Sequence, residues 1–152
     1  AGGVLTAQAV AWFQREGLPM PGAVGMFCAA AYNFSRGDSA PFTTVLTGRH
    51  PDPENNEYFS NIDIKNPLVF PGQSFDILKK FPPSLLITST RDSGLSSVAY
   101  THSQLVKLDV DAELHVWEGL GHAFFFEPDL PESREVYDVV VKFFDNHLGV
   151  LN

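Results

Sequence analysis

The order of apolar and polar positions along the chain predicts three strands. Ala23–Tyr32 is continuously apolar rather than alternating, which is typical of a strand buried on both faces of a parallel sheet. Two shorter segments, Ser84–Ser89 and Ala112–Trp117, have the length and apolar content of further strands.

Apolar positions at helical spacing predict three helices, over Ala7–Glu16, Leu95–Leu108 and Pro131–Leu148. Gly17 and Gly149 stand where helices often end, and Pro131 suits a first helical turn. Ser93 or Ser96 is expected to cap the start of the second helix. The apolar side of that helix is expected to contain Leu95, Val98, Ala99, Leu105 and Val106.

Strands and helices alternate along the chain, which predicts an α/β fold with parallel strands and right-handed helical crossovers. Residues 33–73 interrupt this order, because they are polar, contain several prolines and show little periodicity. We interpret them as a lid-like or irregular excursion with short helices around Phe42–Leu46 and Glu57–Ile62. At 152 residues the chain falls in the usual range for one domain.

Two titratable residues follow two of the predicted strands. Asp92 lies three residues after Ser89, and His122 lies five residues after Trp117. Ligands bind just beyond the carboxyl ends of the strands in an open parallel sheet, so both side chains are expected at one edge of the sheet. An aspartate that orients a histidine, which in turn takes a proton from a nucleophile, is the acid–base pair of nucleophilic hydrolases.

Each of these residues also has a structural interpretation. An Asp after a strand is often a turn residue, and a Gly-x-Gly-His segment can be only a loop; the pair at adjacent strand ends favours catalysis. Structural roles are expected for the remaining histidines, which are His50, His102, His115 and His147.

The balance of charge and hydropathy excludes two classes of partner. The formal net charge is −8, and such a surface repels the phosphates of nucleic acid. No stretch approaches the roughly 20 apolar residues of a membrane span. The single cysteine, Cys28, lies in an apolar run and is expected to be a buried packing thiol rather than a metal ligand. One cysteine fits a reducing, cytoplasmic compartment.

A hydrolase also needs a nucleophile, and the sequence does not contain a convincing one. Ser39 is in Gly-Asp-Ser-Ala-Pro, which lacks the closing glycine of a nucleophile elbow and the strand that should precede it. The Ala1-Gly2-Gly3 start is more informative, because a serine before Ala1 would complete Gly-x-Ser-Ala-Gly-Gly. The Ala1 backbone N–H would then be an oxyanion-hole donor at the start of a helix.

Several stretches resemble the hormone-sensitive-lipase-like esterases, a family of α/β-hydrolases. They are Ala1-Gly2-Gly3, Asn66-Pro-Leu-Val69, Phe81-Pro-Pro-Ser-Leu-Leu-Ile-Thr-Ser-Thr-Arg-Asp92, Ala112-Glu-Leu-His-Val-Trp-Glu-Gly-Leu-Gly-His122-Ala-Phe-Phe and Val141-Lys-Phe-Phe-Asp-Asn-His-Leu-Gly149. The resemblance implies that Asp92 is the acid of the triad, that His122 is the base, and that no metal or organic cofactor is needed. It also implies that the chain is the C-terminal half of the domain and begins just after the nucleophile serine.

The chain departs from the family pattern in two places. Ser93-Gly-Leu-Ser-Ser97 replaces a more acidic run after the acid, which leaves open what supports that loop, and Ala123 follows the base where glycine is frequent.

The function that this implies is a serine esterase for short to medium acyl esters, with the serine supplied from outside this chain. The expected partners are a small ester substrate and the N-terminal half of the hydrolase, without which the chain is not expected to act. The aromatic run Phe124–Phe126 is expected to pack in the core, with some of its rings at the acyl site. A lactonase, an amidase or a non-catalytic ligand-binding relative on the same fold is the alternative.

Overall fold

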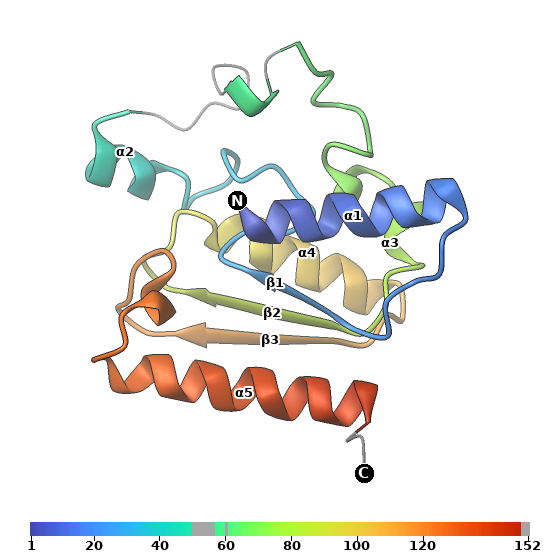
Figure 1. Cartoon of the computed structure of the whole chain (residues 1–152). Coiled ribbons are helices and arrows are strands. Elements are labelled where there is room, and N and C mark those ends of the chain that lie inside the picture. The colour runs from blue at the N-terminus through green and yellow to red at the C-terminus, as the bar shows by residue number, and fades with distance from the viewer. Residues whose placement is uncertain (50–56, 60, 150–152) are drawn as a thin grey trace.

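The computed structural model describes residues 1–49, 57–59 and 61–149 and contains one parallel sheet (Figure 1). Its strands are β1 (Val24–Phe27), β2 (Ser84–Ser89) and β3 (Ala112–Trp117), in the order β1-β2-β3. Both neighbouring pairs are parallel, so all three strands end at the same edge of the sheet. The three strands, their parallel pairing and the α/β class follow the expectation from the sequence.

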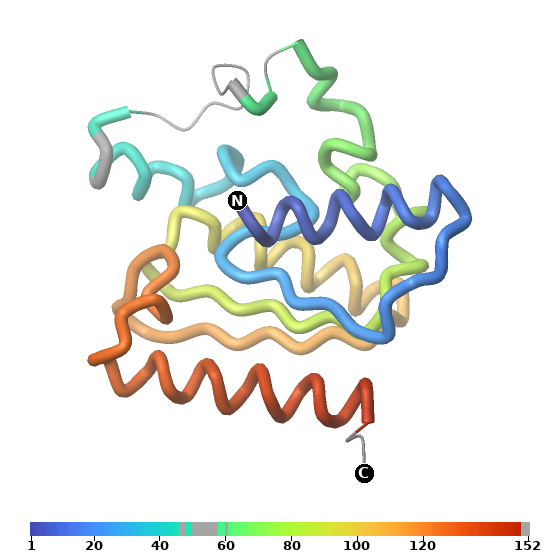
Figure 2. The backbone as a smooth tube through the Cα atoms, viewed as in Figure 1, coloured from blue at the N-terminus to red at the C-terminus, as the bar shows by residue number. Residues whose placement is uncertain are grey.

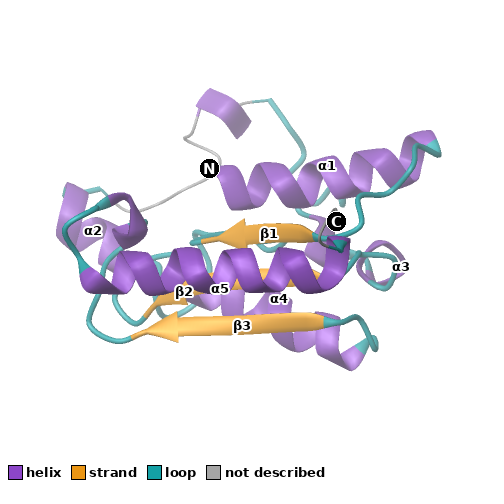
Figure 3. Cartoon of the chain, turned by 60° about the horizontal axis from the view of Figure 1, so that its bottom comes forward, coloured by secondary structure: helices purple, strands orange, loops and turns teal. Residues whose placement is uncertain are grey.

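Helices cover both faces of the sheet. Figure 3 shows α5 (Pro131–Leu148) in front of the strands, with α4 (Leu95–Lys107) behind them. The third long helix, α1 (Gly2–Glu16), lies along β1 on the side of α4. The shorter elements are α2 (Pro41–Thr47), α3 (Phe75–Leu78) and the 3-10 turns η2 (Glu57–Phe59), η3 (Pro71–Gln73) and η4 (Phe124–Phe126).

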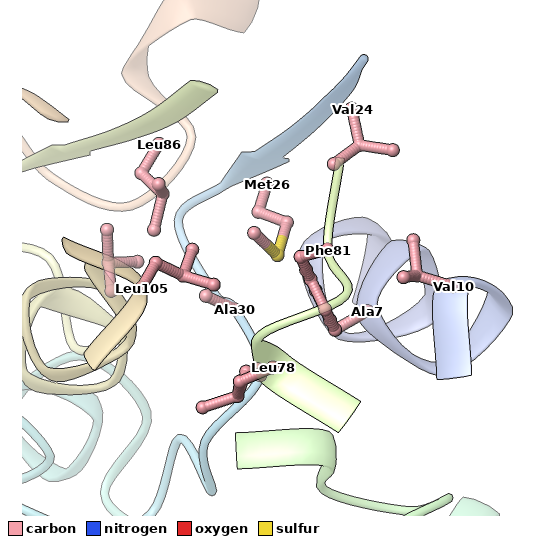
Figure 4. Close-up of a cluster of buried hydrophobic side chains, with 11 residues drawn as sticks. Ala7, Val10, Val24, Met26, Ala30, Leu78, Phe81, Leu86 and Leu105 are labelled. Atoms are coloured by element: carbon pink, nitrogen blue, oxygen red, sulfur yellow. The ribbon is translucent and has the colours of Figure 1, made fainter. Parts of the chain in front are cut away.

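Successive side chains of β2 enter different hydrophobic clusters. Leu86 belongs to a cluster that also contains Met26 of β1, Ala7 of α1 and Leu105 of α4 (Figure 4). Leu85 and Ile87 belong to the other cluster, which is closed by Val136 and Phe143 of α5. Every residue of β2 is buried, as the apolar run predicts for a central strand.

The first strand is shorter than the predicted Ala23–Tyr32. The Cys28 N–H still donates to the Ile87 carbonyl at 2.8 Å, but the Cys28 backbone has a φ of 58° and turns the chain out of the sheet. Residues 29–31 are nonetheless buried, because this loop packs beneath α1. Figure 2 shows the turn at the end of β1. Apolar character therefore predicted the burial of this segment correctly and its backbone conformation wrongly.

Three details of the helices also differ from expectation. Helix α1 begins at Gly2, five residues earlier than predicted. Helix α4 is capped by neither Ser93 nor Ser96; Gly94 takes the N-cap position without a side-chain hydrogen bond. Val106, expected on the apolar side of α4, is 51% exposed, although Val98 and Leu105 are fully buried.

The ends of the helices and the first part of the excursion agree better with the sequence. Gly17 has a left-handed backbone after α1, and Pro131 begins α5 with Gly149 after its end. The helix expected around Phe42–Leu46 is α2, whereas the one expected over Glu57–Ile62 is a single 3-10 turn. No helix in the described part of the chain combines the length and the hydropathy that a membrane crossing requires.

The close approach of α1 to the loop after β1 gives a stability prediction. A Cβ at Gly3 would lie 1.9 Å from the Ala29 carbonyl oxygen, so one of the two backbones would have to move. We expect Gly3→Ala to lower the free energy of unfolding by about 3 kcal/mol in denaturant titrations. Gly121→Ala is the control, because nothing lies within 4 Å of its added Cβ. Equal stability of the two variants would contradict the close approach.

Candidate active site

The structure brings together the two residues that the sequence proposes as acid and base. Asp92 lies in the turn after β2, where its N–H donates to the Ser89 carbonyl at 3.1 Å. His122 lies in the loop after β3, and its Nδ1 is 2.7 Å from the Asp92 Oδ1. Because β2 and β3 are parallel neighbours, their following loops meet at one edge of the sheet.

Asp92 is a fully buried carboxylate with several hydrogen-bond donors around it. The Gly94 N–H donates to Oδ1 at 2.8 Å, and the Thr88 hydroxyl donates to Oδ2 at 2.8 Å. Burial raises the pKa of Asp92, but the hydrogen bonds from His122, Gly94 and Thr88 outweigh it and hold that pKa below its ordinary value. The group is therefore an anion that can orient an imidazole.

Neither Thr88 nor Gly94 was identified from the sequence. A threonine inside a buried strand is common for packing reasons alone, and a glycine after an aspartate is common in turns. Only the distances in the folded chain show that both serve Asp92.

The loop that carries His122 is fastened to the end of β2. Ser89 Oγ donates to the Gly121 carbonyl at 3.0 Å, and the Arg91 N–H donates to the Leu120 carbonyl at 3.1 Å. The Gly119 N–H donates to Thr90 Oγ1 at 2.7 Å. These bonds fix Asp92 and His122 relative to each other through the backbone as well as through their side chains.

The sharp turns of this loop lie at Gly119 and Ala123. Gly119 has a positive φ of 75°, whereas Gly121 does not. Ala123, directly after the base, has a φ of 58°, a conformation that costs a residue with a Cβ about 1 kcal/mol. Glycine would suit position 123 because it adopts this left-handed backbone without that cost.

His122 and Ala1 line one cavity of about 620 Å³. Its wall is mostly apolar and includes Val4, Leu5, Ala29, Phe34 and Phe59. Nδ1 of His122 is engaged in the hydrogen bond with Asp92, and the His122 side chain is 44% exposed. Nε2 is therefore the nitrogen that remains available to a reacting group. A small apolar molecule in this cavity would lie beside the imidazole of His122.

The run Phe124–Phe126 does not line this cavity. Phe124 and Phe125 are buried in the cluster beneath α5, as expected for two of the three rings. Phe126 is 77% exposed. Core packing of two of the three rings agrees with the expectation, because η4 directs them into this cluster.

Ser39 is buried and engaged in hydrogen bonds. Its hydroxyl donates to the Ser93 carbonyl at 2.9 Å and accepts from the Ser96 N–H at 2.8 Å. A hydroxyl held in this way is unsuited to attack a substrate, in agreement with the exclusion of Ser39 as the nucleophile.

One group of potential metal ligands occurs among the described residues, and it overlaps the acid–base pair. Atoms of Cys28, Asp92 and His122 lie within 4.8 Å of one another. Burial, with a smaller contribution from the charge of Asp92, raises the pKa of the Cys28 thiol to about 12, which disfavours the thiolate that a metal needs. The Ala123 N–H also donates to Cys28 Sγ at 3.3 Å. Cys28 is thus a buried thiol, as the sequence indicates.

The other described histidines make their contacts away from Asp92. His102 Nε2 is 3.2 Å from the Ala112 carbonyl, and His115 Nε2 is 3.3 Å from Glu113. His147 contacts the Phe143 carbonyl and Asp111, which raise its pKa. His50 lies outside the described residues.

The hydrogen bond from Thr88 gives a pH-dependent prediction. Because the pKa of Asp92 is lowered on folding, its charge stabilises the fold above about pH 4, and this stabilisation is lost as the pH falls through the folded-state value. We expect Thr88→Val to cost about 1–3 kcal/mol at pH 7, with a smaller difference from the parent near pH 3.

Denaturant titrations at both pH values test this expectation. Thr101→Val is the control, because that buried hydroxyl donates only to the Ser97 carbonyl within α4. Its effect should be small and independent of pH. An effect of Thr88→Val that is equally independent of pH would contradict the role of Thr88 at Asp92.

Comparison with known proteins places this geometry in a family. Residues 1–126 match the family model described as the alpha/beta hydrolase fold. No curated protein matches the chain significantly. Among solved structures, an esterase/lipase from an uncultured bacterium is similar at 24% identity and a TM-score of 0.82, over 99% of this chain and 51% of that one.

Two further solved structures have higher sequence identity. An esterase called E25 is 28% identical with a TM-score of 0.78, over 95% of this chain and 46% of its own. An esterase from the bacterial hormone-sensitive lipase family is 25% identical with a TM-score of 0.79, over 98% of this chain and 51% of its own. The chain thus spans about half the length of these structures. By the family match over residues 1–126, the chain belongs to the alpha/beta-hydrolase family, and it is similar to the hormone-sensitive-lipase-like esterases within it.

Proposed function

We propose that this chain is the acid–base half of a serine esterase that hydrolyses short to medium acyl esters of small alcohols. The observation that carries the proposal is the 2.7 Å contact between His122 Nδ1 and Asp92 Oδ1 beside an apolar cavity. A buried carboxylate that fixes one nitrogen of an imidazole leaves the other nitrogen to act as a base.

The reaction would run through an acyl-enzyme. The serine oxygen attacks the ester carbonyl carbon while His122 Nε2 takes the serine proton. The tetrahedral intermediate then collapses, and the leaving alcohol takes the proton from His122. Water repeats both steps and releases the acid. Asp92 keeps its negative charge throughout and stabilises the imidazolium in each half of the cycle.

The Ala1 backbone N–H is proposed as one donor of the oxyanion hole. Ala1 occupies the N-cap position of α1 and lines the same cavity as His122. Unsatisfied N–H groups at the start of a helix favour negative charge, and the developing oxyanion carries that charge. A serine directly before Ala1 would lie in the same place.

The N-terminal half of the hydrolase is the proposed source of that serine, as a separate chain or as a preceding segment. Two features of the described residues support such a partner. Strand β1 pairs only with β2 and leaves its other edge open, and an open edge pairs readily with another strand. Helix α1 also exposes the large apolar side chain of Trp12, at 47%.

The triad assignment is tested in the hydrolase that contains this chain and its serine-bearing half. We expect Asp92→Asn to lower kcat for p-nitrophenyl butyrate on the order of 10⁴-fold, because the imidazole loses its anionic partner. A fluorophosphonate probe should label a serine upstream of Ala1, as seen by intact mass, and His122→Ala should slow that labelling to a similar degree.

His115→Ala is the matched control, because that histidine lies on β3 and contacts Glu113 rather than Asp92. Its kcat should stay close to that of the parent. Failure of the probe to label any serine, or full activity of Asp92→Asn, would exclude the proposed mechanism. Binding of a small ester without turnover would favour a non-catalytic relative instead.

The acyl chain is proposed to lie in the cavity along Val4 and Leu5. Leu5→Trp should fill part of this space, and its exposed position makes the larger ring tolerable. We expect kcat/KM for an octanoyl ester to fall about 10-fold relative to a butyryl ester, since each buried methylene is worth about 0.8 kcal/mol. Leu18→Trp is the control, because Leu18 is similarly exposed but does not line the cavity. An unchanged octanoyl-to-butyryl ratio would place the acyl chain elsewhere.

A further inference from the structure

The loop after Asp92 is held by a residue 53 positions earlier in the chain. Ser39 is 4% exposed, and its hydroxyl bonds to both the Ser93 carbonyl and the Ser96 N–H. The Ser39 N–H in turn donates to Ser96 Oγ at 3.1 Å. Three hydrogen bonds therefore join residues 33–49, the first part of the excursion, to the acid loop.

The backbone at Gly37 also lies close to the side chain of Ser96. Gly37 has a φ of 89°, and a Cβ at this position would lie 2.4 Å from the Ser96 Cβ. Ala40, next to Ser39, is 2% exposed. The bonds of Ser39 are consequently shielded from water and held at a fixed separation, which makes them stronger than the same bonds at a surface.

Ser39 is connected to the acid through a single peptide group. The Ser93 carbonyl, which accepts from Ser39, and the Gly94 N–H, which donates to Asp92 Oδ1 at 2.8 Å, belong to the same planar unit. Asp92 Oδ1 is also the atom that contacts His122 Nδ1. A rotation of this peptide would weaken the donor to the carboxylate oxygen that orients the imidazole.

We propose that Ser39 is a positioning residue for the acid–base pair and acts through the peptide between Ser93 and Gly94. The role rests on the proposed esterase function for its effect on turnover, although the geometry of the pair can be measured without turnover. It also answers what supports the acid loop of this chain, where Ser93-Gly-Leu-Ser-Ser97 takes the place of a more acidic sequence.

The test compares Ser39→Ala with Ser97→Ala in the complete hydrolase. Ser97 is a matched control, because it is 3% exposed and its hydroxyl makes one long-range bond, to the Tyr32 carbonyl at 2.6 Å. It does not bond to the Ser93–Gly94 peptide. The readouts are kcat and KM for p-nitrophenyl butyrate, and the low-field proton resonance of His122 Nδ1–H, which reports its hydrogen bond to Asp92.

We expect Ser39→Ala to lower kcat roughly 10-fold to 100-fold with little change in KM, because a displaced catalytic group affects the chemical step. The low-field resonance should shift upfield or broaden. Ser97→Ala should leave kcat and the resonance as in the parent, even where both variants lose similar thermal stability.

Several results would overturn the proposal. They are equal kcat values for the two variants, an unchanged resonance in Ser39→Ala, or a rise in KM at constant kcat, which would assign Ser39 to the cavity wall. If Ser39→Ala does not fold, Ser96→Ala removes only the acceptor of the Ser39 N–H, and a smaller change in the same direction is expected. A parent with no esterase activity but with a resonance that depends on Ser39 would refute the proposed function and leave the positioning role intact.

Discussion

The burial of the Asp92 carboxylate constrains the edge of the sheet where β2 and β3 end. An anion without exposure to water is costly unless several donors surround it, and the cost of an unpaired buried charge amounts to several kcal/mol. The donors come from three parts of the chain: Thr88 from β2, Gly94 from the loop before α4, and His122 from the loop after β3. All three parts must be in place before the Asp92 carboxylate has its hydrogen-bond donors. The folding of this edge of the sheet therefore also sets the positions of Asp92 and His122 relative to each other.

Close backbone contacts around the end of β1 supply the rigidity that this arrangement needs. Gly3 of α1 lies against the Ala29 carbonyl, and Gly94 lies against the Cys28 carbonyl, where an added Cβ would come within 1.9 Å in both cases. The left-handed turn at Cys28 presents those carbonyls to the two glycines. The start of α1, the end of β1 and the acid loop are therefore packed backbone to backbone, with no side chain between them that could rearrange.

The same packing explains why the cavity and the acid–base pair belong together. Val4, Leu5 and Ala29 form part of the cavity wall, and they lie on the two segments that meet at Gly3. Residues 33–49 close another side through Phe34 and reach the acid loop through Ser39. A molecule in the cavity thus contacts His122 itself, as well as segments that pack against the loop after Asp92 through Cys28 and Ser39.

Local pattern was sufficient for the elements and for the order of the site residues. The bounds of β2, β3 and α5 agree with the apolar runs and the helical spacing of the sequence, although only β2 is buried along its whole length, whereas α5 buries a single face through residues such as Val136 and Phe143. The adjacency of Asp92 and His122 followed from strand order, because parallel neighbours end at one edge. The resemblance to hormone-sensitive-lipase-like esterases also lies in local motifs, and the family match agrees with it.

Contacts between distant segments were decided only by the tertiary structure. The end of β1 at Phe27, the choice of Phe124 and Phe125 as the buried rings of their run, and the hydrogen bonds of Ser39 to the acid loop each depend on a partner that is far away in the sequence. Such partners leave no periodic signal, since a serine that bonds across 54 residues has the same local context as a serine in any turn. The sequence by itself determined which elements form and which two residues face each other, and the tertiary structure decided how the acid is held, because hydrogen-bond partners are selected by distance in space.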